Sequence, residues 1–132
     1  MAKLTPYFFS EDARSQSEFY VSALGGEINS IMTFGETPNC PDAMKDKVMH
    51  LCMTVAGVTF FMSDSVQGPL QQGNSLDLNL EYATVEEARA AFDRLSAGGK
   101  VVAPLKKEFW GSWFSKLEDK YGVGWMITTA GE

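Results

Sequence analysis

The sequence contains the same short pattern twice, 73 residues apart. FYVSALGGEI at residues 19–28 returns as FDRLSAGGKV at residues 92–101, and GVTFFM at 57–62 is echoed by GVGWMI at 122–127. Two copies are too few for a solenoid, which needs about three repeats or more to bury a continuous core. The duplication therefore predicts two similar modules packed around one shared cleft, and the cleft is where we expect function to lie.

Both halves show the same order of elements: a strand, a helix and three further strands. Ser10-Glu11-Asp12 supplies a capping oxygen and acidic residues ahead of a predicted helix over 13–24, which Gly25-Gly26 ends. Thr84 caps a second predicted helix over 85–96, followed by Gly98-Gly99. Strands are predicted at 4–9, 28–34, 48–55, 58–62, 76–82, 101–107, 113–117 and 123–129.

These elements predict an α+β fold made of two βαβββ modules. The modules span residues 1–64, with regular structure from about residue 4, and residues 76–130. A linker at 65–75, rich in Gly, Gln and Pro, joins them into a single domain over 1–132. A loop without periodicity is expected at 35–47.

Composition limits the classes of partner. The net charge of −6, with Lys106-Lys107 as the only basic pair, argues against nucleic-acid and anionic-membrane partners. No apolar run reaches the ~20 residues of a membrane span, and residues 1–4 lack the apolar stretch of a signal peptide. Cys40 and Cys52 lack CxxC spacing. We therefore expect a cytoplasmic protein with reduced thiols.

Longer motifs resemble a known superfamily. FYxxxLGG after the first helix, and a closing strand after DKYG at 119–122, resemble the vicinal-oxygen-chelate superfamily of glyoxalase I, extradiol dioxygenases and bleomycin-resistance proteins. The segments FWGSWF at 109–114, FGETP at 34–38 and MSD at 62–64 resemble its PhnB-like branch. The resemblance implies a glyoxalase-like curved mixed sheet around a cleft. Members of this branch often carry a methyltransferase label, but here the glycine pairs end helices instead of opening them, unlike a nucleoside-cofactor turn.

The resemblance also implies where a metal would bind. Metal-dependent relatives place one ligand on the first and last strand of each half, positions that correspond here to Thr5, Phe61, Asp77 and Met126. Divalent metals prefer imidazole, carboxylate or thiolate ligands, and only Asp77 offers one. We therefore expect no bound metal and no cofactor.

The hairpin register predicts the wall of the cleft. If Ala56-Gly57 is the turn, Cys52 lies opposite Phe61 and His50 opposite Ser63, and alternation places these side chains on one face. The same alternation adds residues of the outer strands. The predicted ligand-binding residues are Thr5, Tyr7, Phe9, His50, Cys52, Phe61, Ser63, Asp77, Asn79 and Met126.

The predicted function is binding of a small, partly apolar molecule by a bleomycin-resistance-like homodimer. One alternative is a metal-dependent lyase or dioxygenase with relocated ligands such as His50 and Asp77. Another is a non-catalytic regulatory module that acts through its dimer surface. His50 could instead be a structural residue, and Asp77 and Asn79 could be solvated. We expect at least one of Trp110, Trp113 and Phe114 to lie at the dimer interface, rather than in a pocket lid or the core.

Overall fold

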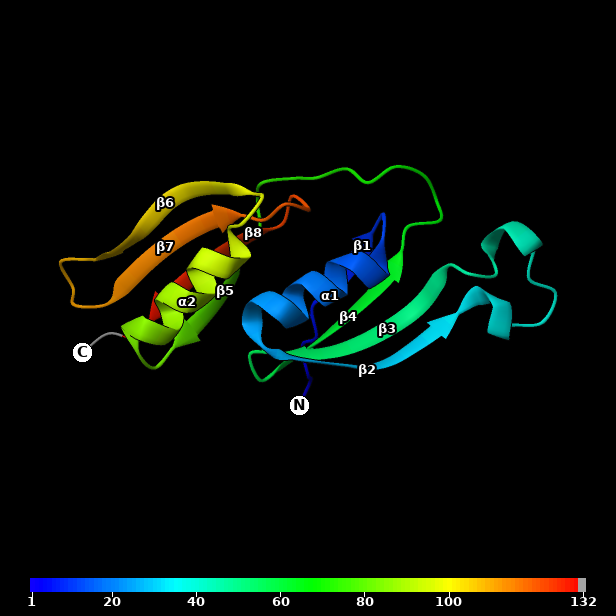
Figure 1. The fold of residues 1–132 in the computed structure, drawn as a ribbon, viewed down its shortest axis with the longest axis horizontal. Helices are drawn as coiled ribbons and strands as arrows, with labels where there is room; N and C mark the ends of the chain where they lie inside the picture. Colours follow the sequence, from blue (N-terminus) through cyan, green and yellow to red (C-terminus); the bar gives the residue numbers. More distant parts are fainter. Residues whose placement is uncertain (131–132) are drawn as a thin grey trace. The chain divides into compact units, whose positions relative to one another are not determined.

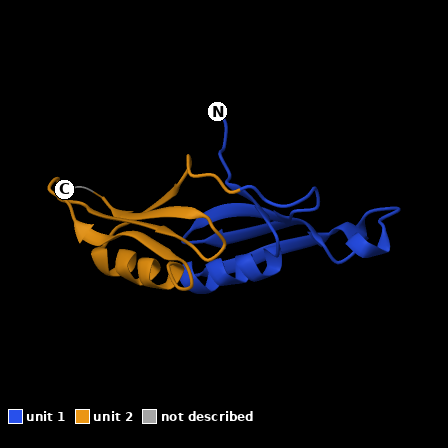
Figure 2. Cartoon of the chain, turned by 90° about the horizontal axis from the view of Figure 1, so that it is seen from above, with its two compact units in different colours: residues 1–71 blue, residues 72–132 orange. Residues whose placement is uncertain are grey.

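The computed structural model describes residues 1–130 and divides the chain into two compact units, residues 1–71 and 72–132 (Figure 2). The division falls inside the predicted linker. That the two units make one domain stays a prediction. Among residues 1–130, no helix combines the length and apolar character that crossing a bilayer requires.

The first unit is a four-stranded mixed sheet with one helix on it (Figure 1). The strand order is β1-β4-β3-β2, in which β1 and β4 run parallel and the other pairs are antiparallel. Two short 3-10 turns occupy the stretch predicted as an irregular loop. The elements are β1 (Tyr7–Ser10), α1 (Ala13–Leu24), β2 (Gly26–Thr33), η1 (Phe34–Glu36), η2 (Asp42–Met44), β3 (Val48–Val55) and β4 (Val58–Asp64).

The second unit repeats this topology. Its strand order is β5-β8-β7-β6, in which β5 and β8 run parallel and the other neighbouring pairs are antiparallel. The elements are β5 (Leu78–Tyr82), α2 (Val85–Leu95), β6 (Lys100–Lys107), β7 (Trp113–Glu118) and β8 (Gly124–Thr129). The predicted α+β fold with two βαβββ modules is therefore confirmed.

The capping signals in the sequence set the start of both helices. The Asp12 side chain accepts a hydrogen bond from the Ser15 N–H at 3.1 Å, and Thr84 Oγ1 accepts from the Glu87 N–H at 3.2 Å. These oxygens satisfy N–H groups that have no partner within the helix. Asp12 and Thr84 therefore fix where each helix leaves its preceding strand.

The paired glycines have equivalent places in the two units. Gly25 and Gly98 adopt the left-handed region, with φ of 78° and 76°, where a side chain is strained. The second glycine of each pair lies against the neighbouring strand: a Cβ on Gly26 would overlap the Thr54 carbonyl oxygen, and a Cβ on Gly99 that of Glu118. The glycines therefore end each helix and let the next strand approach its partner.

The core of each unit lies between its helix and its sheet. In the first unit α1 covers one face of the sheet, and the buried side chains between them are Tyr20 from the helix and Leu51, Met53, Phe60 and Met62 from the sheet. In the second unit α2 packs over β8, β5 and β7. Its core includes Phe92, Leu95, Leu117, Trp125 and Ile127.

The repeat aligns Phe19 with Phe92 and predicts equivalent places for them in the two cores, and this prediction is wrong. Phe92 is buried, but Phe19 is only half-buried, and Tyr20 holds the corresponding core place. Tyr20 follows the cap Asp12 by the same interval as Phe92 follows Thr84. Since α1 has 12 residues and α2 has 11, an alignment anchored on the glycines is displaced by one residue at the helix faces.

Candidate functional site

The β3–β4 hairpin has the predicted register. Ala56 and Gly57 form its turn, with φ of 51° and 75°. Cys52 pairs with Phe61 and Thr54 with Thr59. Side chains alternate along a strand. Phe60 and every second residue from it along β4 therefore point towards α1, whereas Phe61 and His50 point to the opposite face of the sheet.

An aromatic cluster occupies the face of the first sheet away from α1. Phe61 pairs with Tyr7 across the parallel β1–β4 ladder, and their ring centres lie 6.1 Å apart with planes at 74°. The His50 ring centre is 4.8 Å from that of Phe61 and 6.0 Å from that of Tyr7. Phe9 joins them, 5.2 Å from Tyr7. We call Tyr7, Phe9, His50 and Phe61 the aromatic cluster.

Two rings of the aromatic cluster are exposed to solvent. Tyr7 is 43% exposed and Phe9 62% exposed, although both belong to a strand paired in the sheet. Large apolar side chains exposed together mark binding surfaces more often than isolated ones do. The cluster therefore offers an accessible aromatic surface around a single imidazole.

A cavity of about 610 Å³ adjoins the aromatic cluster and shares Tyr7 and Phe9 with it. We call it the first-unit cavity. The segment 65–71 forms one side, and the end of β4 contributes Ser63 and Asp64. The apolar side chains that line it include Phe34, Met49, Val66 and Leu70. Its volume lies within the range of about 300–1,000 Å³ that is usual for small-molecule sites.

The carboxylate of Asp64, at one end of this cavity, accepts hydrogen bonds from two other elements. Its Oδ1 accepts from the Ala13 N–H at 2.8 Å, and its Oδ2 accepts from the Val48 N–H at 2.7 Å. Asp64 thereby ties the start of α1 and the start of β3 to the end of β4. This role and the contribution of segment 65–71 were not predicted, although apolar Val66 and Leu70 within a polar linker were a usable signal.

The remaining predicted residues of the first unit lie near this surface. Thr5 precedes β1 and is half-buried. Cys52 is half-buried on β3, with its Sγ 3.7 Å from Asn29 Oδ1 on the adjacent strand. Ser63 is buried and lines the first-unit cavity. Binding of a ligand by these residues stays a prediction.

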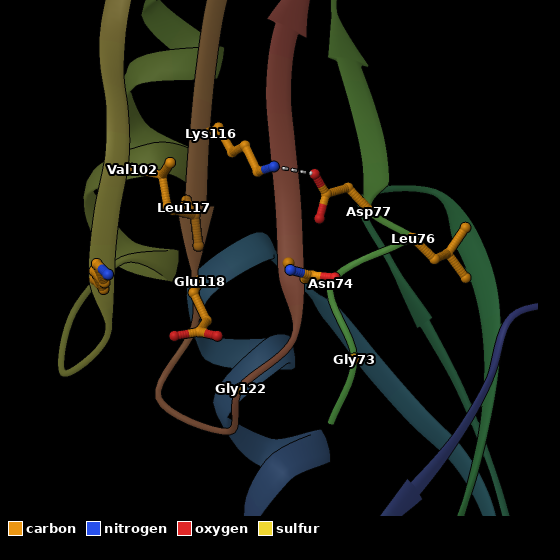
Figure 3. Close-up of a pocket in the computed structure, with 11 residues that line it drawn as sticks. Gly73, Asn74, Leu76, Asp77, Val102, Lys116, Leu117, Glu118 and Gly122 are labelled. Atoms are coloured by element: carbon orange, nitrogen blue, oxygen red, sulfur yellow. Dashed lines mark ion pairs between the residues drawn. The ribbon is translucent and has the colours of Figure 1, made fainter. Parts of the chain in front are cut away.

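The predicted residues of the second unit lie on a polar face. Lys116 Nζ on β7 makes an ion pair of 2.9 Å with Asp77 Oδ2 (Figure 3). Asn79 pairs with Met126 in the β5–β8 ladder, and its Oδ1 accepts from Thr128 Oγ1 at 3.0 Å. Asp77 and Lys116 line a cavity of about 180 Å³. The sequence did not predict Lys116 as a site residue, because its ion pair with Asp77 depends on how three strands align.

The residues at the four implied metal positions do not fit a divalent metal. Thr5, Phe61 and Met126 lack the ligand groups such metals prefer. Asp77, the one carboxylate, lies beside the Lys116 ammonium. Among residues 1–130, no three His, Cys, Asp or Glu side chains form a group that could hold a metal ion.

A second aromatic surface lies at the turn between β6 and β7. Phe109 is 96% exposed and Trp110 is 52% exposed, and their ring centres lie 4.8 Å apart in an edge-to-face contact. Trp113 and Phe114, at the start of β7, are half-buried, and the guanidinium carbon of Arg89 lies 6.0 Å from the Trp113 ring centre. We call Phe109 and Trp110 the aromatic turn.

Known proteins are similar to this chain along nearly its whole length. A family model described as 3-demethylubiquinone-9 3-methyltransferase matches residues 2–128. Protein YjdN of Escherichia coli K12 is 32% identical over 136 residues, covering 94% of this chain and 92% of YjdN.

Solved structures show the same similarity. Protein PA1353 from Pseudomonas aeruginosa is 29% identical with a TM-score of 0.85, and both chains are covered completely. The PhnB protein from Bacillus cereus, described as a putative 3-demethylubiquinone-9 3-methyltransferase, is 29% identical with a TM-score of 0.79, covering 98% of this chain and 100% of that one. A glyoxylase/bleomycin resistance protein/dioxygenase domain from Frankia, 12% identical with a TM-score of 0.74, covers 100% of this chain and 98% of its own and shares the fold.

Proposed function

This chain belongs to the 3-demethylubiquinone-9 3-methyltransferase family, in the PhnB-like branch of the vicinal-oxygen-chelate superfamily, and from that premise we propose that it binds a small, partly apolar molecule without a bound metal. The binding site is the first-unit cavity together with the aromatic cluster. The protein acts as a cytoplasmic homodimer.

The observation that supports this proposal most strongly is the continuity of the cavity with the cluster. Tyr7 and Phe9 belong to both, so a molecule inside the cavity would touch exposed aromatic rings. Small-molecule sites are usually concave and mostly apolar, with a few polar groups that fix orientation. Here Ser63, Tyr7 and the nearby His50 supply such groups.

Methyl transfer is not part of the proposed function, although the family is described as a methyltransferase. A nucleoside cofactor usually binds at a glycine-rich turn between a strand and a helix, where free N–H groups meet its phosphates or ribose. Within residues 1–130, the strand-to-helix turns are Glu11-Asp12 and Ala83-Thr84. Their helix N–H groups already donate to Asp12 and Thr84.

Neighbouring phenylalanines on β4 provide the test. Phe61→Ala should weaken binding of any molecule found in the purified protein by native mass spectrometry, or of fragments that shift the amide signals of residues 65–71. It should cost less unfolding free energy than Phe60→Ala, which opens the core at a side chain 2% exposed and should cost about 3–5 kcal/mol. Phe109→Ala, on the aromatic turn, is the control and should leave affinity unchanged.

A regulatory dimer module is the second candidate, and the exposed aromatic turn favours it. If a fragment screen finds no molecule that shifts residues 65–71, the binding proposal is wrong. The regulatory candidate then gains support only if changes in the aromatic turn alter self-association. Stoichiometric zinc, iron, nickel or manganese in the purified protein would instead favour a metal-dependent enzyme.

A further inference from the structure

The cavity of about 180 Å³ in the second unit, which we call the second-unit cavity, is lined by charges of both signs (Figure 3). Lys100 and Lys116 contribute ammonium groups, and Asp77 and Glu118 contribute carboxylates. The charges of these lining residues therefore balance. The volume lies below the range of about 300–1,000 Å³ that is usual for drug-sized ligands, so the cavity suits a very small compound.

Strand register places Lys100, Lys116 and Glu118 on one face of the second sheet. Lys100 on β6 and Glu118 on β7 lie opposite each other in the β6–β7 ladder. Lys116 precedes Glu118 by two residues, so both side chains point away from the buried face, to which Leu117 between them belongs. The three charged side chains thus lie beside one another on the face that α2 does not cover.

Asp77 completes the set, and its position depends on a glycine. A Cβ on Gly124 would overlap Asp77 Oδ1, so the carboxylate fills the place that a side chain on β8 would take. From there Asp77 Oδ2 makes its ion pair of 2.9 Å with Lys116 Nζ, which extends across β8 (Figure 3). The Asp77 side chain is only 14% exposed. The pair therefore forms a partly enclosed end of the second-unit cavity.

Groups that can bind a ligand remain at this cavity. An ammonium group has three donors, and Lys116 uses one of them on Asp77 Oδ2. Lys100 and Glu118 make no ion pair with any of residues 1–130, although they lie opposite each other. Ammonium donors and carboxylate acceptors are thus available side by side.

A compound with one charge of each sign would use both kinds of group. A simple carboxylate would be repelled by Asp77 and Glu118, and a simple amine by the two ammonium groups. A zwitterion can direct its carboxylate to the lysines and its ammonium to Glu118. Hydrogen bonds of this kind, between two charged partners, are roughly twice as strong as those between neutral groups.

We propose that the second-unit cavity binds a small zwitterion of the α-amino acid type. The carboxylate of the ligand accepts from Lys116 and Lys100, and its ammonium donates to Glu118. The second-unit cavity shares no lining residue with the first-unit cavity. This binding site is therefore independent of the proposed function.

Four compounds of nearly equal size and different charge test the site in the full chain. At about pH 6.5, where α-amino groups are protonated, L-alanine is a zwitterion, L-lactate an anion, L-alaninamide a cation and L-lactamide uncharged. Calorimetry and the amide shifts of residues 73–77 and 116–124 give the dissociation constants. L-Alanine should bind about tenfold or more tightly than each of the others. Raising the ionic strength from about 0.1 M to about 1 M should weaken its binding.

Matched variants assign the groups. Lys116→Met keeps the side-chain length but removes the ammonium, and it should abolish the preference for L-alanine over L-alaninamide. Glu118→Gln should abolish the preference over L-lactate. Because Glu118 is exposed, this variant keeps the test valid if Lys116→Met lowers stability. The control is Lys106→Met, which removes a charge opposite Phe114 and outside the cavity and should change no affinity.

Each possible result bears on the proposal. Binding of any of the other three compounds as tightly as L-alanine would overturn the selection of a zwitterion. No binding of L-alanine at millimolar concentration, or amide shifts confined to residues 65–71, would overturn the site itself. An equal loss of affinity in Lys106→Met and Lys116→Met would overturn the assignment of Lys116. None of these results affects the first-unit cavity, which Phe61→Ala tests.

Discussion

Tyr82 in β5 is the residue whose surroundings fit it least. Its hydroxyl is buried and has no hydrogen-bond partner among the residues that the structure describes, 1–130. Burial, and secondarily the Glu87 carboxylate, raise the pKa of Tyr82 above its ordinary value of 10.0. The folded chain therefore favours the neutral phenol, whereas the unfolded chain ionises near pH 10. Ionisation of Tyr82 therefore leaves stability unchanged below about pH 10 and lowers it as the pH rises through the raised pKa.

Tyr82→Phe tests this linkage. Removing a buried hydroxyl without a partner should raise the unfolding free energy by about 1 kcal/mol at neutral pH. It should also reduce the fall in melting temperature between pH 9 and 12, because the ionisable group is gone. Thermal melts across that range measure both effects, with Tyr121→Phe as the control. An alkaline fall of equal size in wild type and Tyr82→Phe would contradict the argument.

At the level of single residues, the sequence predicts contacts that follow from strand alternation and fails where they depend on the path of loops. The meeting of Tyr7, His50 and Phe61 follows from the period of two and the Ala56-Gly57 turn. The cavity wall formed by Val66 does not, because the linker has no periodicity to indicate where it runs. The ion pair between Lys116 and Asp77 also depends on tertiary register.

At the level of elements, local chemistry determines most of the fold. Side-chain caps start both helices and glycines end them, so their bounds agree closely with the predicted ones. The predicted strand 76–82 starts at Leu78 in the structure, and the predicted loop 35–47 contains two 3-10 turns. The first of these is fixed by Glu36, whose Oε2 accepts from the Thr33 N–H at 2.8 Å. Such short turns lack the periodic signal that longer elements provide.

The join between α2 and β6 leaves no space for a side chain at Gly99. A Cβ on Gly99 would overlap the Glu118 carbonyl oxygen and lie 2.9 Å from Asp119 Cα. Gly99→Ala should therefore push β6 away from β7 and lower the unfolding free energy by about 2–3 kcal/mol. Gly73→Ala is the matched control, since a Cβ there meets nothing within 4 Å. Chemical denaturation of both variants measures the difference, and equal stabilities would contradict the close approach.

At the level of the whole molecule, one topology carries two different surfaces. Tyr7 pairs with Phe61 in the first unit, and Asn79 pairs with Met126 at the equivalent place in the second. The first pair belongs to an aromatic cluster, whereas the second lies beside the Asn79–Thr128 hydrogen bond. The repeat thus predicts the fold of both units, but only the side chains distinguish the unit that offers an apolar cavity from the one with a charged pocket.

The aromatic turn is the surface on which we expect two chains to associate. Phe109 and Trp110 are the exposed aromatic pair of the second unit, and fully burying one such side chain gains about 1.5–3 kcal/mol. Replacing both with Ser should weaken a dimer by about 100-fold or more, as measured by sedimentation equilibrium across a range of protein concentrations. Leu76→Ser, at an apolar side chain that is 78% exposed, controls for the loss of exposed apolar area alone. A wild-type chain that sediments as a monomer at every concentration would refute the dimer. If the double variant dimerises as tightly as the wild type, the dimer interface does not include the aromatic turn.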